Sequence, residues 1–311
     1  VKKCGGRNIK LAPISGQVFC DLDDAGASKL QSVPGLAVKL LKRVKSQDTL
    51  GGIIPPEPGP GPLEVPIYAS SQVSLASELF YLRSALDPPI TGKNITIAIL
   101  DSGIRHTHEG LKNKVIYEAN FSNSPTCEDI FDHGTGVAYC AVGGRHSVGE
   151  EGGAAPGAQV WNIKVLDDNG EGDEENVVMA IEHCIDRKRK LMESGLLEND
   201  PQIANFMNLS WGAPDDGDPD NPIRLVCKAA FEARIGSVVA AGNGGPAPGS
   251  LMSPACDLNT VAVGAVTFVP FEVWEFSSRG PTKEGLIKPD VVFYGIFTSL
   301  HPRDYANFYG R

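Results

Sequence analysis

The sequence predicts an α/β fold in which a mostly parallel, doubly wound sheet lies between two layers of helices, preceded by a small α+β unit. Three observations carry this prediction. Residues 95–100 form a short apolar run, interrupted only by Thr96, as a strand buried on both faces requires. Strand-like and helix-like segments then alternate along the chain, which is typical of a parallel sheet covered by helices. A Pro/Gly-rich seam at residues 51–62 separates the two parts.

This seam divides the 311 residues into a small unit at 1–50, a linker at 51–64 and a large domain at 65–311. In the small unit, residues 17–22 alternate weakly like a strand, and residues 26–44 predict a helical stretch interrupted at Pro34-Gly35. A positive cluster lies just before the seam, and we interpret it as a solvated helix end. Its members are Lys39, Lys42, Arg43 and Lys45.

The large domain supplies the remaining strands and helices. After the first strand, we expect four more at residues 159–166, 203–209, 237–241 and 260–266. Between them, residues 174–193 carry apolar side chains close to helical spacing. A second helix is predicted over residues 221–233, and Pro222 is suited to its first turn.

Composition and charge exclude several classes of protein. Hydrophobic residues make up 41% and charged residues 21%, as in ordinary globular proteins. The net charge of −10 argues against nucleic acid as a partner, because binding phosphates needs a basic face. No apolar run is long enough to cross a bilayer, so no membrane partner is expected. Seven cysteines without a C-x-x-C pair exclude a zinc ribbon or thioredoxin-like motif and leave the redox compartment open.

Three polar residues follow predicted strands or begin a helix. Asp101 comes directly after the first apolar strand, at the sheet edge where such folds gather their catalytic groups. His133 precedes two glycines in Asp132-His133-Gly134-Thr135-Gly136, at the expected start of a tightly packed helix. Asn243 lies on a glycine-rich turn after another strand and could donate its amide to a developing oxyanion. A turn cap, a structural histidine and a plain turn are the alternatives for these three residues.

Taken together, these and other motifs resemble the subtilisin-like serine proteases over residues 75 to 295. The segments that carry the resemblance stand in the family's order: Asp101-Ser102-Gly103-Ile104, His133-Gly134-Thr135, Ala155-Pro156-Gly157-Ala158, Lys164-Val165-Leu166, Asn208-Leu209-Ser210-Trp211-Gly212, Ala241-Gly242-Asn243, Phe276-Ser277-Ser278-Arg279-Gly280-Pro281 and Lys288-Pro289-Asp290-Val291.

The resemblance implies a role for each matched residue. Asp101 would orient His133, His133 would act as general base, and Asn243 would stabilise the oxyanion. The substrate would be a polypeptide bound as an added strand. One wall of its specificity pocket would be formed by Ser210, Trp211 and Gly212, and the other by Ala240, Ala241 and Gly242. No cofactor is required, and secretion or another extracytoplasmic location is expected from the family.

The small unit resembles, more weakly, the later part of the inhibitory propeptide of these proteases. Gly5-Gly6-Arg7, the strand near Val18 and residues 27–38 carry this likeness. It implies that the chain's own propeptide is an intramolecular partner and that the linker lies near the maturation site. A generic small αβ unit fits the same residues.

The chain also departs from the family pattern. Gly136 stands where relatives usually have His, and Phe293-Tyr294-Gly295 replaces Ala-Pro-Gly. The nucleophile motif Gly-Thr-Ser-Met-Ala is absent, and Ser299 is a poor substitute because Phe297 replaces the required glycine. We therefore expect a C-terminally incomplete domain that, expressed alone, is inactive and poorly soluble. The alternative is a catalytically dead relative that acts as a binding or regulatory protein.

Other readings rest on single features. A nucleotide-binding domain would need a glycine-rich turn after the first strand, where this chain has Asp101-Ser102-Gly103. His106 and His108 could bind zinc, but no third candidate ligand lies at a spacing typical of zinc sites. The acidic stretches 167–175 and 215–220 leave structural calcium open, although neither follows EF-hand spacing, and we interpret both as solvated loops.

Overall fold

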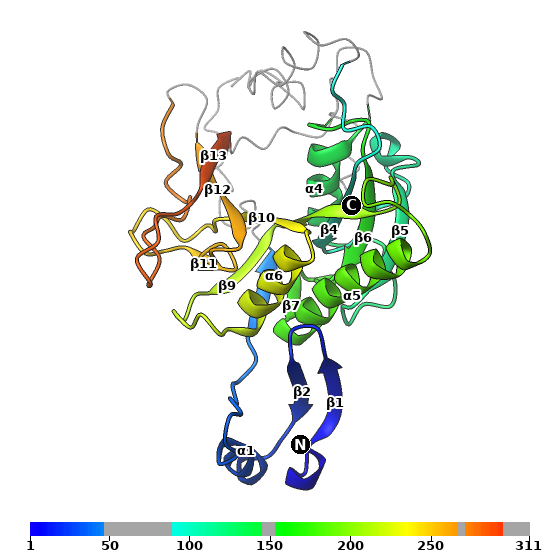
Figure 1. Cartoon of the computed structure of the whole chain (residues 1–311). Coiled ribbons are helices and arrows are strands. Elements are labelled where there is room, and N and C mark those ends of the chain that lie inside the picture. Colours follow the sequence, from blue (N-terminus) through cyan, green and yellow to red (C-terminus); the bar gives the residue numbers. More distant parts are fainter. Residues whose placement is uncertain (47–88, 145–152, 267–270, 295–311) are drawn as a thin grey trace.

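Seven parallel strands form the main sheet of the computed structural model, which describes residues 1–46, 89–144, 153–266 and 271–294 (Figure 1). Every neighbouring pair in this sheet is parallel, so the predicted α/β fold is confirmed. The strands lie in the order β13 (Val291–Tyr294), β12 (Thr260–Val266), β10 (Gly236–Ala240), β8 (Ala204–Leu209), β4 (Thr96–Asp101), β6 (Gln159–Lys164) and β5 (Val115–Asn120).

Helices cover both faces of this sheet. On one face, Tyr139 and Val142 of α4 (His133–Val142) pack against Ile99 of β4, with η2 (Glu109–Leu111) beside them. On the other face, α5 (Glu174–Glu193) and α6 (Pro222–Glu232) pack together against Leu100 and Ile163. Successive residues of β4 therefore enter opposite cores, which explains its continuous apolar run.

Both predicted helices form where the sequence places them. Helix α5 has the predicted bounds, and α6 begins at Pro222. Its N-cap is Asn221, whose side-chain oxygen accepts a hydrogen bond from the Ile223 amide at 3.0 Å.

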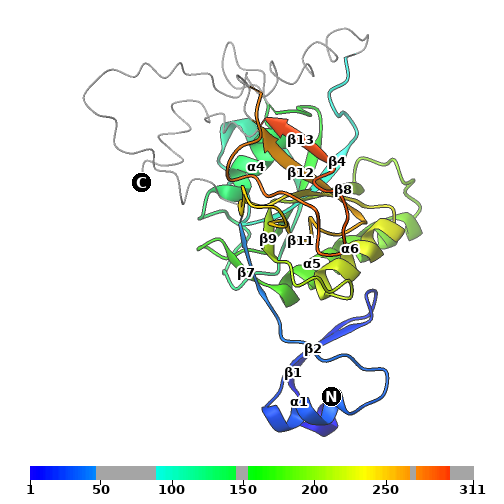
Figure 2. The ribbon, with the colours of Figure 1, turned by 90° about the vertical axis from the view of Figure 1, so that its left-hand side faces the viewer.

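A second sheet contains four short strands in the order β11 (Met252–Ser253), β9 (Trp211–Pro214), β3 (Arg43–Ser46) and β7 (Glu171–Asp173). Strand β3 comes from the small N-terminal unit and lies antiparallel between two strands of the large domain. The blue chain of β3 can be followed into the body of the molecule in Figures 1 and 2. The N-terminal unit thus shares a sheet with the large domain.

The rest of the N-terminal unit comprises η1 (Lys2–Cys4), the hairpin of β1 (Arg7–Ala12) and β2 (Gln17–Asp21), and α1 (Asp24–Gln31). The tip of this hairpin reaches α5 (Figure 1). There the backbone N–H and the hydroxyl of Ser15 both donate to Glu182 Oε1, at 2.5 and 2.6 Å. Gln17 also donates to the carbonyl of Pro222 at 3.0 Å. The unit is therefore attached to the large domain at its hairpin tip as well as through β3.

The prediction of a helical stretch through residue 44 is wrong beyond α1. The helix ends at Gln31, and Gly35 then adopts a left-handed φ of +76°. Residues 37–42 form no regular element, and residues 43–46 form β3. The pairing of β3 with β7 and β9 decides its conformation, and a single sequence does not reveal such partners. The predicted linker at 51–64 lies outside the described residues.

Candidate active site

Asp101 and His133 meet at the carboxyl edge of the main sheet. Asp101 is the last residue of β4, and His133 is the first residue of α4. The Nδ1 atom of His133 lies 2.7 Å from Oδ1 of Asp101, whose side chain is only 1% exposed. A buried carboxylate at Nδ1 fixes the orientation of the imidazole and leaves Nε2 able to accept a proton.

The approach of α4 to β4 depends on Gly134. A Cβ atom at this position would lie 2.3 Å from the carbonyl oxygen of Gly103 and 3.1 Å from Cβ of Asp101. The first contact is closer than real Cβ atoms reach, so a side chain here would push the helix away from the strand. Gly134 therefore allows His133 to reach Asp101.

A second carboxylate, that of Asp129, binds the first amides of α4. No sequence motif pointed to it. It accepts hydrogen bonds from the amides of Asp132 and Thr135, from the Thr135 hydroxyl and from the Ser102 hydroxyl, all at 2.6–2.9 Å. Burial raises its pKa, and the bonds from Thr135 and Ser102 oppose that rise. The signal that could have revealed it is an aspartate a few residues before a helix start, where the first amides need acceptors.

The hydroxyl of Ser102 has a structural role. It donates to Asp129 and accepts from the amide of Gly134 at 2.9 Å, while the Ser102 amide donates to Oδ1 of Asp101 at 2.7 Å. Ser102 is fully buried. It is a local hydrogen-bonding group between β4 and α4.

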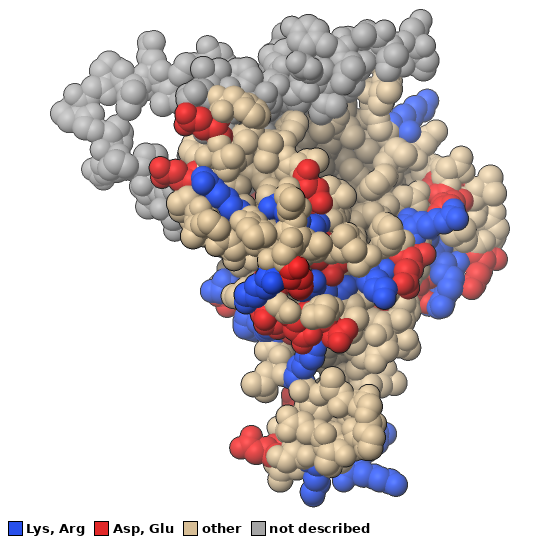
Figure 3. Space-filling view, turned by 60° about the vertical axis from the view of Figure 1, so that its left-hand side comes forward, with Lys and Arg blue, Asp and Glu red and all other residues tan. Residues whose placement is uncertain are grey.

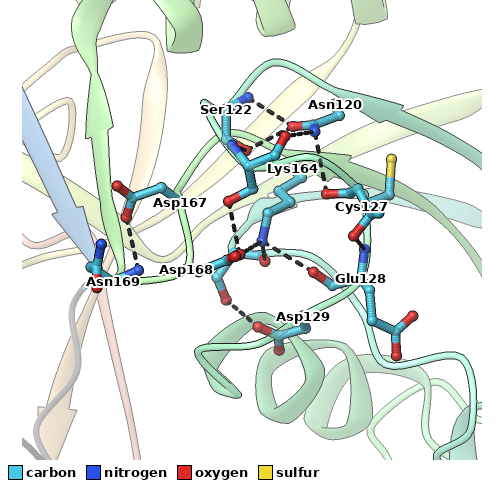
Figure 4. A network of polar contacts seen from close by, with 12 residues as sticks. Asn120, Ser122, Cys127, Glu128, Asp129, Lys164, Asp167, Asp168 and Asn169 are labelled. Atoms are coloured by element: carbon cyan, nitrogen blue, oxygen red, sulfur yellow. Dashed lines mark hydrogen bonds and ion pairs between the residues drawn. The ribbon is translucent and has the colours of Figure 1, made fainter.

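A buried cation, Lys164, lies beside the segment that contains Glu128 and Asp129 (Figure 4). It is the last residue of β6, its side chain is fully buried, and it belongs to the matched segment Lys164-Val165-Leu166. Its Nζ atom donates to the carbonyls of Ser102 and Glu128 and lies 3.1 Å from Oδ1 of Asp168. The ammonium therefore joins the loop after β4 to the segment before Asp129. These contacts offset the desolvation cost of burying its charge.

Asn243 follows β10, two strands away from β4 at the same carboxyl edge. The preceding Gly242 has a φ of +112°, and a Cβ atom there would lie 2.7 Å from Met252 and 2.8 Å from the Ser278 hydroxyl. Ser278 holds the turn on both sides of Asn243: its amide donates to the Gly242 carbonyl at 2.9 Å, and its hydroxyl accepts from the Gly244 amide at 3.0 Å. The turn that carries Asn243 is thereby fixed in place.

The two predicted pocket walls are linked through β11, which pairs with β9 and is bonded to Ala241. Gly212 and Trp211 lie opposite Lys45 and Ser46 of β3, and Ser210 accepts a hydrogen bond from Asn208 at 2.8 Å. On the other wall, the carbonyl of Ala241 accepts from the amide of Met252 at 3.2 Å, and β11 then pairs with β9. The remaining predicted wall residues are Ala240, which ends β10, and Gly242.

Trp211 connects the second sheet to β4. Its side chain is fully buried, and its indole Nε1–H donates to the carbonyl of Leu100 at 2.9 Å. Leu100 immediately precedes Asp101. The strand that borders β3 is therefore tied by one side chain to the strand that carries the carboxylate.

The basic cluster and the acidic stretches pair with each other, which corrects their interpretation as separate solvated segments. Lys39 contacts Asp218, and Lys42 contacts Asp216. Further pairs join Arg43 to Asp173 and Glu171, and Lys45 to Glu171. Figure 3 shows blue and red side chains side by side in a band across the middle of the molecule. The partners lie more than 120 residues apart in sequence, so neither stretch reveals the other.

The proposed zinc ligands have other contacts. His106 Nε2 lies 2.9 Å from Glu118, and the buried ring of His108 packs on Tyr139 with ring centroids 5.1 Å apart. Within residues 1–46, 89–144, 153–266 and 271–294, no group of three or more His, Cys, Asp or Glu residues is placed to hold a metal ion. The helices in those same ranges include none that is long and apolar enough to cross a membrane.

Comparison with known proteins agrees with this geometry. Residues 92–310 match the subtilase (Peptidase_S8) family. The chain is 31% identical over 220 residues to serine protease AprX of Bacillus subtilis, covering 67% of this chain and 47% of AprX. It is 30% identical over 221 residues to a subtilisin of Bacillus sp. TA39, covering 68% of this chain and 50% of that protein.

A third relative is the human membrane-bound transcription factor site-1 protease, which is 31% identical over 211 residues, 66% of this chain and 18% of that protein. The chain spans about half the length of the first two relatives. The family match covers well over half of the chain, and the Asp101–His133 pair lies within it. The chain belongs to the subtilase family of serine peptidases.

Proposed function

We propose that this chain carries the base and the substrate-binding elements of a serine-type endopeptidase. The observation that supports this most directly is the 2.7 Å contact between His133 Nδ1 and Asp101 Oδ1 at the carboxyl edge of the sheet. With Nδ1–H donated to Asp101, Nε2 takes the proton of an attacking serine and later returns it to the leaving amine. The amide of Asn243 donates to the oxyanion of the tetrahedral intermediate.

Substrates bind as an added strand between β7 and β9, in the place that β3 occupies in this structure. We refer to this place, bounded by Glu171–Asp173 and Trp211–Pro214, as the strand slot. The antiparallel register of β3 with both neighbours supports this assignment, as do the hydrogen bond from the Ser46 amide to the Gly170 carbonyl (3.0 Å) and the burial of Val44. Polypeptides are the substrates because the slot satisfies main-chain groups.

The N-terminal unit acts as an intramolecular inhibitor in this proposal. Its strand β3 fills the strand slot, and Ser15 at its hairpin tip is bound to the buried carboxylate of Glu182 on α5. Two separate contacts on the same large domain favour this role over that of an independent αβ unit. The maturation site would then follow Ser46 in the chain.

The motif serines of the described residues do not supply the nucleophile. The hydroxyls of Ser277 and Ser278 accept from the amides of Ala265 and Gly244, and Ser102 is bound between β4 and α4. Ser299 lies outside the described residues. We propose that the 311-residue chain alone does not hydrolyse peptide bonds. The strand slot would then also serve a non-hydrolytic relative that binds peptides, which is the second candidate function.

Hydrolysis of a fluorogenic peptide library tests these proposals, measured on the 311-residue chain and on the product of the complete gene. We expect no turnover by the chain, and turnover by the gene product that His133→Ala lowers by about 10⁶, the size of the loss in subtilisin. If the 311-residue chain hydrolyses the library and His133→Ala abolishes this hydrolysis, the proposed inactivity of the chain is wrong. Turnover unaffected by His133→Ala would overturn the site assignment, and a gene product that binds peptides without cleaving them would support the second candidate.

The extracytoplasmic location is also a proposal, and it rests on the family resemblance. Fractionation of the native cell, followed by immunodetection of the protein, tests it. Recovery of the protein in the cytosol would overturn it.

A further inference from the structure

We infer that the strand slot selects cationic peptides, specifically strands with Lys or Arg at two positions that flank a small aliphatic residue. This inference rests on the proposal that the slot takes substrate strands. Its basis is the way in which β3 is held: Val44 points into the core, while Arg43 and Lys45 point outward to an acidic strand.

The outward side chains of the bound strand meet β7. Arg43 lies 2.5 Å from Asp173 and 3.4 Å from Glu171, and Lys45 lies 2.6 Å from Glu171. Because successive side chains of β7 also alternate, Glu171 and Asp173 lie on one side of their strand with Gly172 between them. Glu171 and Asp173 lie two positions apart on β7. They therefore recognise two basic residues that lie two positions apart on the bound strand.

The central position takes an aliphatic side chain. Val44 is fully buried and pairs with Gly172 across the ladder. A Cβ atom at position 172 would lie 3.0 Å from Cγ2 of Val44, so the glycine leaves the space that this side chain uses. A charged side chain here would lose its hydration without a partner, which is costly.

Acidic residues continue around β7 and after β9 along the path of the bound segment. Six of the nine residues from 167 to 175 are acidic, and four of the six from 215 to 220. Glu174 accepts a hydrogen bond from the Lys42 amide at 2.9 Å, Asp216 contacts the Lys42 side chain and Asp218 contacts Lys39. A strand that enters the slot without basic side chains at these positions would leave the same carboxylates without counter-charges. Selection therefore comes from attraction to basic strands and repulsion of acidic ones.

The first experiment tests the charge pattern within the chain. The Arg43→Glu/Lys45→Glu variant should increase hydrogen exchange of the Ser46 amide, which donates to Gly170 in the docked strand. Adding Glu171→Lys/Asp173→Lys should restore protection. Arg189→Glu/Lys190→Glu, an equal charge change at exposed positions of α5, is the matched control and should leave Ser46 unchanged. Unchanged protection in the first variant would overturn the inference.

The second experiment tests selection of an added peptide. The receptor is the full chain with Arg43→Glu/Lys45→Glu, which weakens its own β3, and binding is measured by fluorescence polarisation. The labelled probe has the sequence of residues 40–46, and two further probes carry Gln or Glu in place of all three basic residues. We expect the basic probe to bind about tenfold more tightly than the Glu probe, with the Gln probe between them, and to lose this advantage in high salt.

Outcomes of the second experiment separate the two proposals. In a receptor that instead carries Glu171→Lys/Asp173→Lys with Arg43 and Lys45 unchanged, like charges repel its own β3 from the slot, and the order of the probes should reverse. Equal binding of all three probes would overturn charge selection and leave the strand slot as a main-chain site. Failure of every probe to bind, while Ser46 exchanges freely, would overturn the slot as a substrate site and the inference with it.

Discussion

The hydroxyl of Ser102 donates to Oδ1 of Asp129 across 2.9 Å, and this hydrogen bond joins the end of β4 to the residue that accepts from the first amides of α4, the helix that carries His133. Asp129 is therefore a positioning residue, because it acts through the two elements that present Asp101 and His133. We expect Asp129→Ala to lower the free energy of unfolding by about 2–4 kcal/mol, since buried amides and hydroxyls lose their acceptor.

Urea denaturation of the 311-residue chain measures this effect, with Glu193→Ala as control because that side chain is 68% exposed. The control should change stability by less than about 0.5 kcal/mol. Equal stability of the Asp129→Ala variant and the unmodified chain would contradict the positioning role.

Ser278 gives a second prediction, concerning the turn of Asn243. Ser278→Ala removes the acceptor of the Gly244 amide, so the turn should loosen and peptide hydrolysis by the complete gene product should fall about tenfold in kcat with little change in KM. Ser277→Ala is a matched control, because its hydroxyl accepts from Ala265 on β12 instead. Both variants should lose about 1 kcal/mol of stability, but only Ser278→Ala should lower kcat. Equal losses of kcat would contradict the prediction.

Val44 gives a prediction about docking of the N-terminal unit. Val44→Ala removes two buried methyl groups, worth about 1.6 kcal/mol, so the protection of the Ser46 amide should fall roughly tenfold. Leu40→Ala is the control, because Leu40 is 93% exposed and its loss should leave protection unchanged. Hydrogen exchange followed by NMR measures both variants. A similar fall in the two would mean that burial at the slot does not hold β3.

Acid should release β3 from the slot. Contact with Lys45 lowers the pKa of Glu171, and contact with Lys39 lowers that of Asp218. For Asp216, partial burial raises the pKa, but the bond to Lys42 and further hydrogen bonds prevail and bring it to about 2. Groups with a lowered pKa stabilise the docked state above their ordinary pKa and lose that effect as the pH falls through the lowered value.

Docking should therefore weaken between about pH 4.5 and pH 2, on the ordinary carboxyl pKa values. The protection factor of the Ser46 amide, corrected for the intrinsic exchange rate, follows the release. The amide of Val160, which donates to the Lys114 carbonyl at 2.9 Å, reports global unfolding. Loss of protection at Ser46 before Val160 is the expected result, and simultaneous loss would contradict it.

The main sheet could be predicted because each of its strands has an apolar pattern that is visible in its own residues, without knowledge of its partners. Strand β12 and helix α5 have the predicted bounds, since one is a short, largely apolar run and the other has a continuous apolar stripe. Strand β7 was missed because Glu-Gly-Asp has no strand propensity and is held by its pairing with β3. The pairing of Arg43 with Asp173 was missed for a similar reason, because it forms only when distant segments meet.

The site was predicted in part. The family motifs indicated Asp101 and His133, and the structure brings these two together. Asp129 belongs to no quoted motif, and its role depends on the close approach of β4 and α4. Asn243 lies at the predicted sheet edge, and its proposed role awaits the measurement of hydrolysis.

The separate attachments of the N-terminal unit make it a multivalent ligand of its own chain. When β3 leaves the slot, the bond between Ser15 and Glu182 still holds the unit nearby, so its effective concentration at the slot stays near the millimolar range. A free peptide competes against that concentration rather than against a dilute inhibitor. Cutting the chain after β3 would therefore not by itself expose the slot, because the severed unit would have to lose all of these contacts before it could diffuse away.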